Sequence, residues 1–140
     1  MTTQIKYVKQ VLCACLILIG LQSYGQVPEF NWNAHSSNAS IGAVDVELNS
    51  NLSRSATVLT WHQSTDNASD TQYLTVRSIE GEWDEQTMIG SVTYKIELDD
   101  QKGEFQIIGD GQNITMNLEL DSEDGRTNTY VFYIDSFNIN

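Results

Sequence analysis

The chain is poor in the residues that cross-link a protein, stiffen it or give it positive charge. Its 140 residues include two cysteines, one proline, two histidines and seven lysines plus arginines. Both cysteines, Cys13 and Cys15, lie near the N-terminus, so the rest of the chain has no thiol for a disulfide or a zinc site. That remainder depends on core packing for its stability, and His35 and His62 are its only nitrogen ligands for zinc.

The chain also lacks an apolar run long enough to cross a membrane as a helix. The longest run, residues 11–21, is about half of the roughly twenty residues that a spanning helix needs. Two lysines precede this run, and a short polar stretch follows it. This order is typical of a secretory signal peptide, which we expect over residues 1–25. Residues 26–140 would then form one mature β domain without a membrane span, exported to the periplasm or the cell exterior.

A lipoprotein is the competing interpretation of the N-terminus. The segment Leu12-Cys13-Ala14-Cys15 is similar to a lipobox that ends in an acylated cysteine, here Cys15. A lipobox belongs at the end of the apolar run, however, and residues 16–21 continue that run. Mass spectrometry of the mature N-terminus separates cleavage near Gly25 from lipidation of Cys15. The sequence leaves a bacterial and a eukaryotic source both open.

The charge balance is strongly acidic. The whole chain has seven basic and nineteen acidic residues, a net charge of −12. Removal of residues 1–25 takes away Lys6 and Lys9, and five basic against nineteen acidic residues give −14. Such a surface excludes nucleic acid as the expected partner, because phosphate binding requires clustered lysine and arginine. Cations, neutral glycans, apolar ligands and basic proteins remain compatible, although acidity also simply keeps an exported protein soluble.

Alternation of apolar and polar residues dominates the chain from residue 41 onward and predicts an all-β fold. Strands are expected over residues 41–48, 56–62 and 71–79, followed by a four-strand meander over 86–135. No sustained helical periodicity occurs outside residues 1–25. About seven antiparallel strands are compatible with a sandwich or a partly closed barrel.

Several local features refine this expectation. Residues 31–40 and 62–71 are rich in Asn, Ser, Thr and Asp and are expected to be loops. Residues 130–134 are apolar on both faces, which predicts a strand that is covered on both sides. Gly90 is expected at a bulge or sheet bend, and Gly103 in a left-handed turn position.

The loop acids make calcium the one cofactor to consider. Asp121, Glu123 and Asp124 precede Gly125, an arrangement superficially similar to an EF-hand loop. The spacing fails, because the glycine comes one position early and no suitably placed glutamate follows. A solvated turn is the simpler interpretation, and no other cofactor is predicted.

The tryptophans are the best sequence evidence for binding. Trp32 and Trp83 fall near expected strand ends, where an exposed aromatic ring can stack on a sugar or anchor a protein interface. Glu82 and Asp84 flank Trp83 and complete the candidate ligand-binding set. Trp61 alternates with apolar neighbours and is expected in the core.

These observations predict a non-catalytic binding or envelope-associated module that recognises a glycan or a protein surface. Catalysis is not expected, because the chain lacks a GxSxG nucleophile elbow and neither histidine has a motif partner. A paired-carboxylate glycoside hydrolase is a remote alternative. The main alternative is a barrel that carries an apolar ligand in a hollow interior. That interior would be lined by Val92, Tyr94, Ile96, Ile114, Met116 and Phe132.

Overall fold

The computed structural model describes residues 28–140, and this part of the chain consists of nine β-strands joined by short connections. Within these residues no helix offers a membrane-crossing segment. The expected signal peptide and both cysteines lie outside the described residues. The strands are β1 (Trp32–Ile41), β2 (Val44–Ser55), β3 (Val58–Ser64), β4 (Ser69–Asp84), β5 (Ile89–Leu98), β6 (Gln101–Asp110), β7 (Ile114–Asp121), β8 (Thr127–Tyr133) and β9 (Ser136–Ile139).

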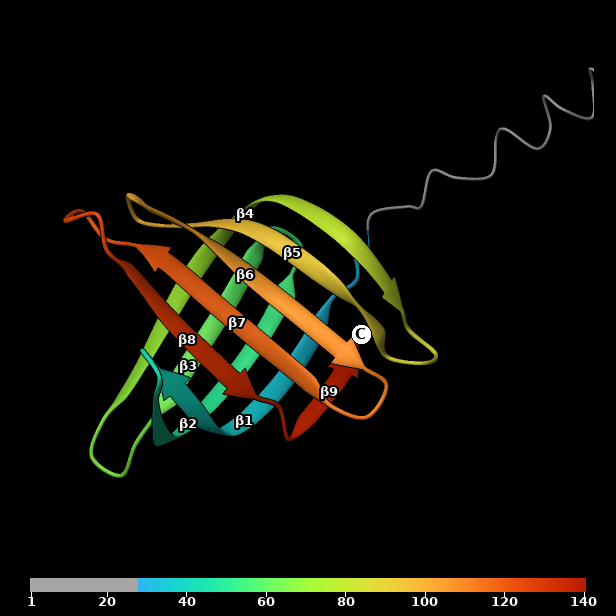
Figure 1. Ribbon diagram of the computed structural model, residues 1–140, viewed down its shortest axis with the longest axis horizontal. Coiled ribbons are helices and arrows are strands. Elements are labelled where there is room, and N and C mark those ends of the chain that lie inside the picture. Colours follow the sequence, from blue (N-terminus) through green and yellow to red (C-terminus); the bar gives the residue numbers. More distant parts are fainter. Residues whose placement is uncertain (1–27) are drawn as a thin grey trace, which may run out of the picture.

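The first eight strands form a closed antiparallel barrel. Each strand from β1 to β7 pairs with the next one along the chain, and β1 also pairs with β8, which closes the sheet. Figure 1 shows β6, β7 and β8 in front of β1, β2 and β3, which form the opposite wall. The all-β meander is therefore confirmed, and of the two expected architectures the barrel is the one observed.

Strands β8 and β9 pair with different halves of the same strand, β1. Residues 38–41 of β1 pair with β8, whereas residues 32–35 pair with β9. A bulge at Ser37 separates the two halves of β1, and the buried Ser36 lies beside it. The Ser36 Oγ is 2.6 Å from the Asn38 carbonyl oxygen and 2.8 Å from that of Tyr133, so its hydroxyl can donate at the point where β8 ends.

Large side chains fill the barrel interior. Strand alternation points one residue in two inward, and Tyr94, Phe132 and Met116 have no accessible surface at all. Trp61 is 4% exposed, which confirms its expected place in the core, and its ring packs edge-on against Phe132. A void large enough for a water molecule would leave accessible surface on the side chains around it. Tyr94, Phe132 and Met116 have none, so the interior around them is packed and not hollow.

Strand β1 is the largest departure from the expected elements, since residues 31–40 were expected to be a loop. Its inward positions are occupied by Trp32, Ala34, Ser36 and Ala39, all buried. Ala34, Ser36 and Ala39 are small, whereas Trp32 is among the largest buried side chains of the barrel. Because Ala and Ser carry little apolar signal, the alternation in this segment is hidden in the sequence.

Two other expectations require correction. The loop expected over residues 62–71 is only residues 65–68 long, because β3 and β4 extend into it. Residues 130–134 are not covered on both sides: Phe132 points inward, but Tyr133 is 50% exposed on the outer wall.

Glycine positions differ from expectation in part. Gly90 has a φ of +148°, a region that favours glycine, but the strand register is continuous there and the sheet bulges lie at Ser37 and Arg77. Gly103 lies within β6, and Asp99 takes the left-handed position of that turn with a φ of +53°. An aspartate tolerates this conformation better than most residues do.

Candidate binding site

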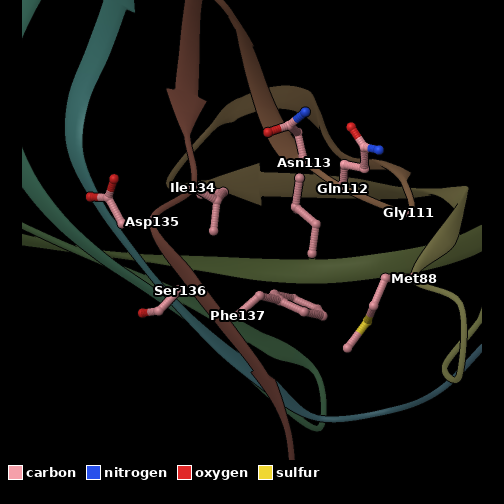
Figure 2. A pocket seen from close by; sticks show the side chains of 9 residues that line it. Met88, Gly111, Gln112, Asn113, Ile134, Asp135, Ser136 and Phe137 are labelled. Carbon is pink, nitrogen blue, oxygen red and sulfur yellow. The ribbon is translucent and has the colours of Figure 1, made fainter.

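A pocket of about 220 Å³ opens at the end of the barrel where β8 stops and β9 begins. Three connections meet there: the β4–β5 hairpin, the β6–β7 turn and the short link from β8 to β9 (Figure 2). We call it the Met88 pocket. It is lined by Met88, Gly111, Gln112, Asn113, Ile114, Ile134, Asp135, Ser136 and Phe137.

The Met88 pocket has apolar walls and a polar rim. In Figure 2 the side chains of Ile134 and Phe137 project into the same space and Met88 faces them, and Ile114 also lines the pocket. All four of these side chains are half-buried. The amide groups of the β6–β7 turn point outward from the rim. This arrangement suits an apolar face or side chain of a ligand that carries polar groups around it.

Aspartates fix the two turns that border the pocket. The Asp84 Oδ1 accepts hydrogen bonds from the backbone N–H groups of Gln86 and Thr87, at 2.9 and 3.1 Å. The Asp110 Oδ1 accepts corresponding bonds from the two residues Gln112 and Asn113, at 2.9 and 2.7 Å. These backbone hydrogen bonds lower the pKa of both carboxyl groups below their ordinary value of 3.8.

Asp135 fixes the third connection. Its Oδ2 accepts a hydrogen bond from the Ser37 backbone N–H at 2.7 Å and lies 3.4 Å from His35 Nδ1. The hydrogen bonds from Ser37 are the main reason why the pKa of Asp135 is lowered, and His35 adds to the effect. A backbone bond from Asp135 N–H to the His35 carbonyl, 2.8 Å long, ties the same link to β1. The pocket is therefore held open by fixed backbone rather than by loose loops.

An aromatic cluster supports the pocket from behind. The ring of Phe137 lies 5.8 Å from that of Trp83, and Trp83 lies 6.1 Å from Phe30. Trp83 fits there because position 109 is glycine: a Cβ on Gly109 would come within 2.7 Å of the indole. Trp83 thus contacts a pocket wall, and its half-buried ring is turned toward the core instead of toward solvent.

The other residues of the predicted ligand-binding set do not join Trp83. Trp32 is only 1% exposed and lies inside the barrel, so the expectation of an exposed ring there is wrong. Glu82 and Asp84 are exposed on the outer face of β4, because alternation places them opposite to Trp83. Asp84 serves the neighbouring turn, as described above.

The acids considered for calcium lie in the β7–β8 connection and its flank. Asp121 accepts a hydrogen bond from the Thr127 hydroxyl, and Asp124 accepts one from the Arg126 backbone N–H. Glu123 is exposed. Between residues 28 and 140, no three His, Cys, Asp or Glu side chains gather closely enough to hold a metal ion. Geometry therefore gives the calcium hypothesis no support at these positions.

In comparisons with known proteins, no family model, no curated protein and no solved structure matches the chain.

The sequence pattern did not reveal the Met88 pocket. Its walls come from separate segments that alternation alone does not bring together. The one available signal was the doubly apolar run 130–134, whose last residue, Ile134, lines the pocket.

Proposed function

We propose that the protein is an exported, non-catalytic binding module that recognises an apolar group on a glycan or protein surface in the Met88 pocket. The observation that carries this proposal is the pocket itself, an open apolar hollow at the end of a barrel whose interior is filled. The small β-barrel fold is compatible with a binding or carrier role. Export and processing near Gly25 remain part of the proposal, and the mature N-terminal mass tests them.

The character of the pocket lining supports a non-catalytic role. Its one carboxylate, Asp135, is occupied by the Ser37 N–H and has a lowered pKa. A carboxyl group with a lowered pKa is a poor general acid near neutral pH. The remaining polar groups at the rim are amides and one hydroxyl, which favour binding over proton transfer.

The carrier alternative has weaker support. Val92, Tyr94, Met116 and Phe132 do point into the interior, yet they are fully buried against one another. A carried ligand would have to displace this packing. The glycoside hydrolase alternative requires two carboxylates at one site, and the Met88 pocket has one, Asp135.

The proposal is tested by methyl NMR of the purified protein during titration with maltotriose and, separately, with a capped leucine tripeptide. Binding in the pocket shifts the methyl signals of Met88, Ile114 and Ile134 selectively. The variant Met88→Asn removes one apolar side chain from the pocket wall. It should keep the backbone conformation, because Met88 has a φ of +55° and asparagine tolerates that region.

The matched control is Ala43→Asn, which places asparagine at a φ of +70° at the opposite end of the barrel. We expect Met88→Asn to abolish the shifts and Ala43→Asn to leave them unchanged. Shifts from maltotriose alone assign a glycan ligand, and shifts from the tripeptide alone assign a protein ligand. Absence of shifts with both probes, or equal shifts in both variants, contradicts the proposal.

A further inference from the structure

Arg54 is a buried cation that forms no ion pair within residues 28–140, although Glu29 lines the same pocket. It projects from β2 and is only 6% exposed. Its Nη1 donates to the Phe30 carbonyl oxygen at 2.6 Å, its guanidinium carbon lies 5.6 Å from the centre of the Tyr94 ring, and its buried Nε has no partner in the described structure. None of the ion pairs among residues 28–140 includes Arg54. Residues 1–27 contain no Asp or Glu that could supply one.

This isolation is unusual in so acidic a chain. Nineteen carboxylates are available, and Arg77 and Lys95 both pair with them on the barrel surface. Burying a charge without a partner is costly, so a buried and uncompensated guanidinium requires a compensating advantage. Binding of an anion at this position is one such advantage.

The side chain of Arg54 lines a pocket of about 350 Å³, within the range of small-molecule sites. We call it the Arg54 pocket. It lies where β3 and β4 stop pairing and diverge. Strand β4 pairs with β3 only up to Thr75, and residues 78–84 pair with β5 alone. The other lining residues are Glu29, Ala56, Thr57, Val76, Arg77, Ser78 and Ile79, none of which lines the Met88 pocket.

The lining defines the chemistry of the ligand. A guanidinium is a strong charged donor to a carboxylate oxygen. Because the Arg54 Nη1 already donates to Phe30 and its Nε is buried, Nη2 is the donor left for a ligand. Arg77, held by Glu97 at 2.6 Å, adds a second cation, and Thr57 and Ser78 add hydroxyl groups. The carboxylate of Glu29 repels a second negative charge on the ligand, so doubly charged phosphate and sulfate are disfavoured. Val76 and Ile79 offer an apolar surface to the rest of the ligand.

We propose that the Arg54 pocket binds a small aliphatic monocarboxylate, whose carboxylate pairs with the Arg54 guanidinium and whose alkyl part lies on Val76 and Ile79. This site is separate from the Met88 pocket and does not depend on its function.

The test measures binding of butyrate to the purified protein by calorimetry and thermal shift, against butyramide and against sodium chloride at matched ionic strength. Butyramide has the same alkyl part without the charge. We expect butyrate alone to bind, Arg54→Met to abolish binding, and Arg77→Gln to weaken it about two- to fivefold, as for an exposed ion pair. The control Arg126→Gln removes one positive charge from the exposed β7–β8 connection and should bind as the wild type does.

A second variant keeps the proposal testable if Arg54→Met fails to fold. Thr57→Glu places a negative charge at the pocket in an exposed turn and should weaken butyrate binding at least tenfold. Thr65→Glu makes the same change in the exposed loop at the opposite end and should have no effect. The proposal would be overturned if butyramide binds as strongly as butyrate, or if inorganic phosphate binds in place of butyrate. Retained butyrate binding in Thr57→Glu, or in a folded Arg54→Met variant, would also overturn it. Absence of butyrate binding would do the same.

Discussion

The indole Nε1 of Trp32 donates a hydrogen bond to the hydroxyl oxygen of Tyr94 at 3.1 Å, across the inside of the barrel. The two residues are 62 positions apart, on β1 and β5, and both are buried. Trp32 also stacks on Phe105 at 5.7 Å, so the bond fixes a ring that fills the centre of the core. Burial raises the pKa of Tyr94, so the hydroxyl stays protonated at neutral pH.

Removing this acceptor should destabilise the fold. Tyr94→Phe leaves the Trp32 N–H buried without a partner, and we expect the free energy of unfolding to fall by about 1–3 kcal/mol. Urea denaturation measures it. Tyr133→Phe removes a hydroxyl from a half-exposed side chain on the outer wall and should change the same free energy by less than about 0.5 kcal/mol. Equal effects of the two substitutions would contradict the role given to the Trp32–Tyr94 bond.

Trp32 and Trp83 should respond differently to substitution by phenylalanine. The Trp83 Nε1 is buried and has no hydrogen-bond partner among residues 28–140, so Trp83→Phe removes no bond. Trp32→Phe breaks the bond to Tyr94 as well as leaving a void. We expect Trp32→Phe to cost about 1 kcal/mol more than Trp83→Phe in urea denaturation. A larger loss for Trp83→Phe would show that its indole N–H is satisfied in solution.

Gly109 should be intolerant of even a methyl group. An added Cβ would lie 2.3 Å from the Met88 carbonyl oxygen and 2.7 Å from Trp83, so backbone and ring must both move. We expect Gly109→Ala to lower the free energy of unfolding by about 1–3 kcal/mol, as for an overpacked core. It should also move the NMR signals of the Met88 pocket.

Gly125→Ala is the matched control for Gly109→Ala. Gly125 has open space around it but a φ of +80°, so alanine there meets backbone strain alone, about 1 kcal/mol. Unchanged Met88 pocket signals in Gly109→Ala would contradict the close contact.

The turns around the Met88 pocket should loosen in acid. The pKa values of Asp84 and Asp110 are lowered in the folded state, so each carboxyl group binds its proton more weakly there than in the unfolded chain. Their stabilising effect is complete above the ordinary carboxyl pKa of 3.8 and is lost as the pH falls through the lower folded values. We expect the melting temperature to decrease below about pH 4.

The double variant Asp84→Asn, Asp110→Asn isolates this effect. Asparagine keeps an acceptor oxygen but does not titrate, so the variant should lose less stability on acidification than the wild type does. Asp66→Asn with Asp100→Asn makes the same charge change at the opposite end of the barrel. A pH dependence reduced equally by both double variants would point to net charge instead of the two turns.

The order of strands β5–β8 follows from local sequence. In residues 89–121, large apolar side chains alternate with polar ones, and an aspartate or glycine stands at each reversal. A half-buried strand needs this pattern, so β5, β6 and β7 could be predicted from it, and the Asp124-Gly125 pair adds the reversal into β8. Strand β1 uses Ala34, Ser36 and Ala39 at its buried positions, and its role as the closing strand depends on partners in β8 that are about 90 residues away.

The two pockets depend on tertiary structure for a similar reason. Met88 and Ile134 are 46 positions apart, and only the closed barrel with β9 beside β1 brings them to one space. Arg54 falls at an inward position of β2, after Leu48, Ser50 and Leu52, yet a charge at such a position also fits a frayed strand end. Alternation is a local property that neighbouring residues specify. Barrel closure and the burial of Arg54 are non-local, because they depend on the register of all eight strands at once.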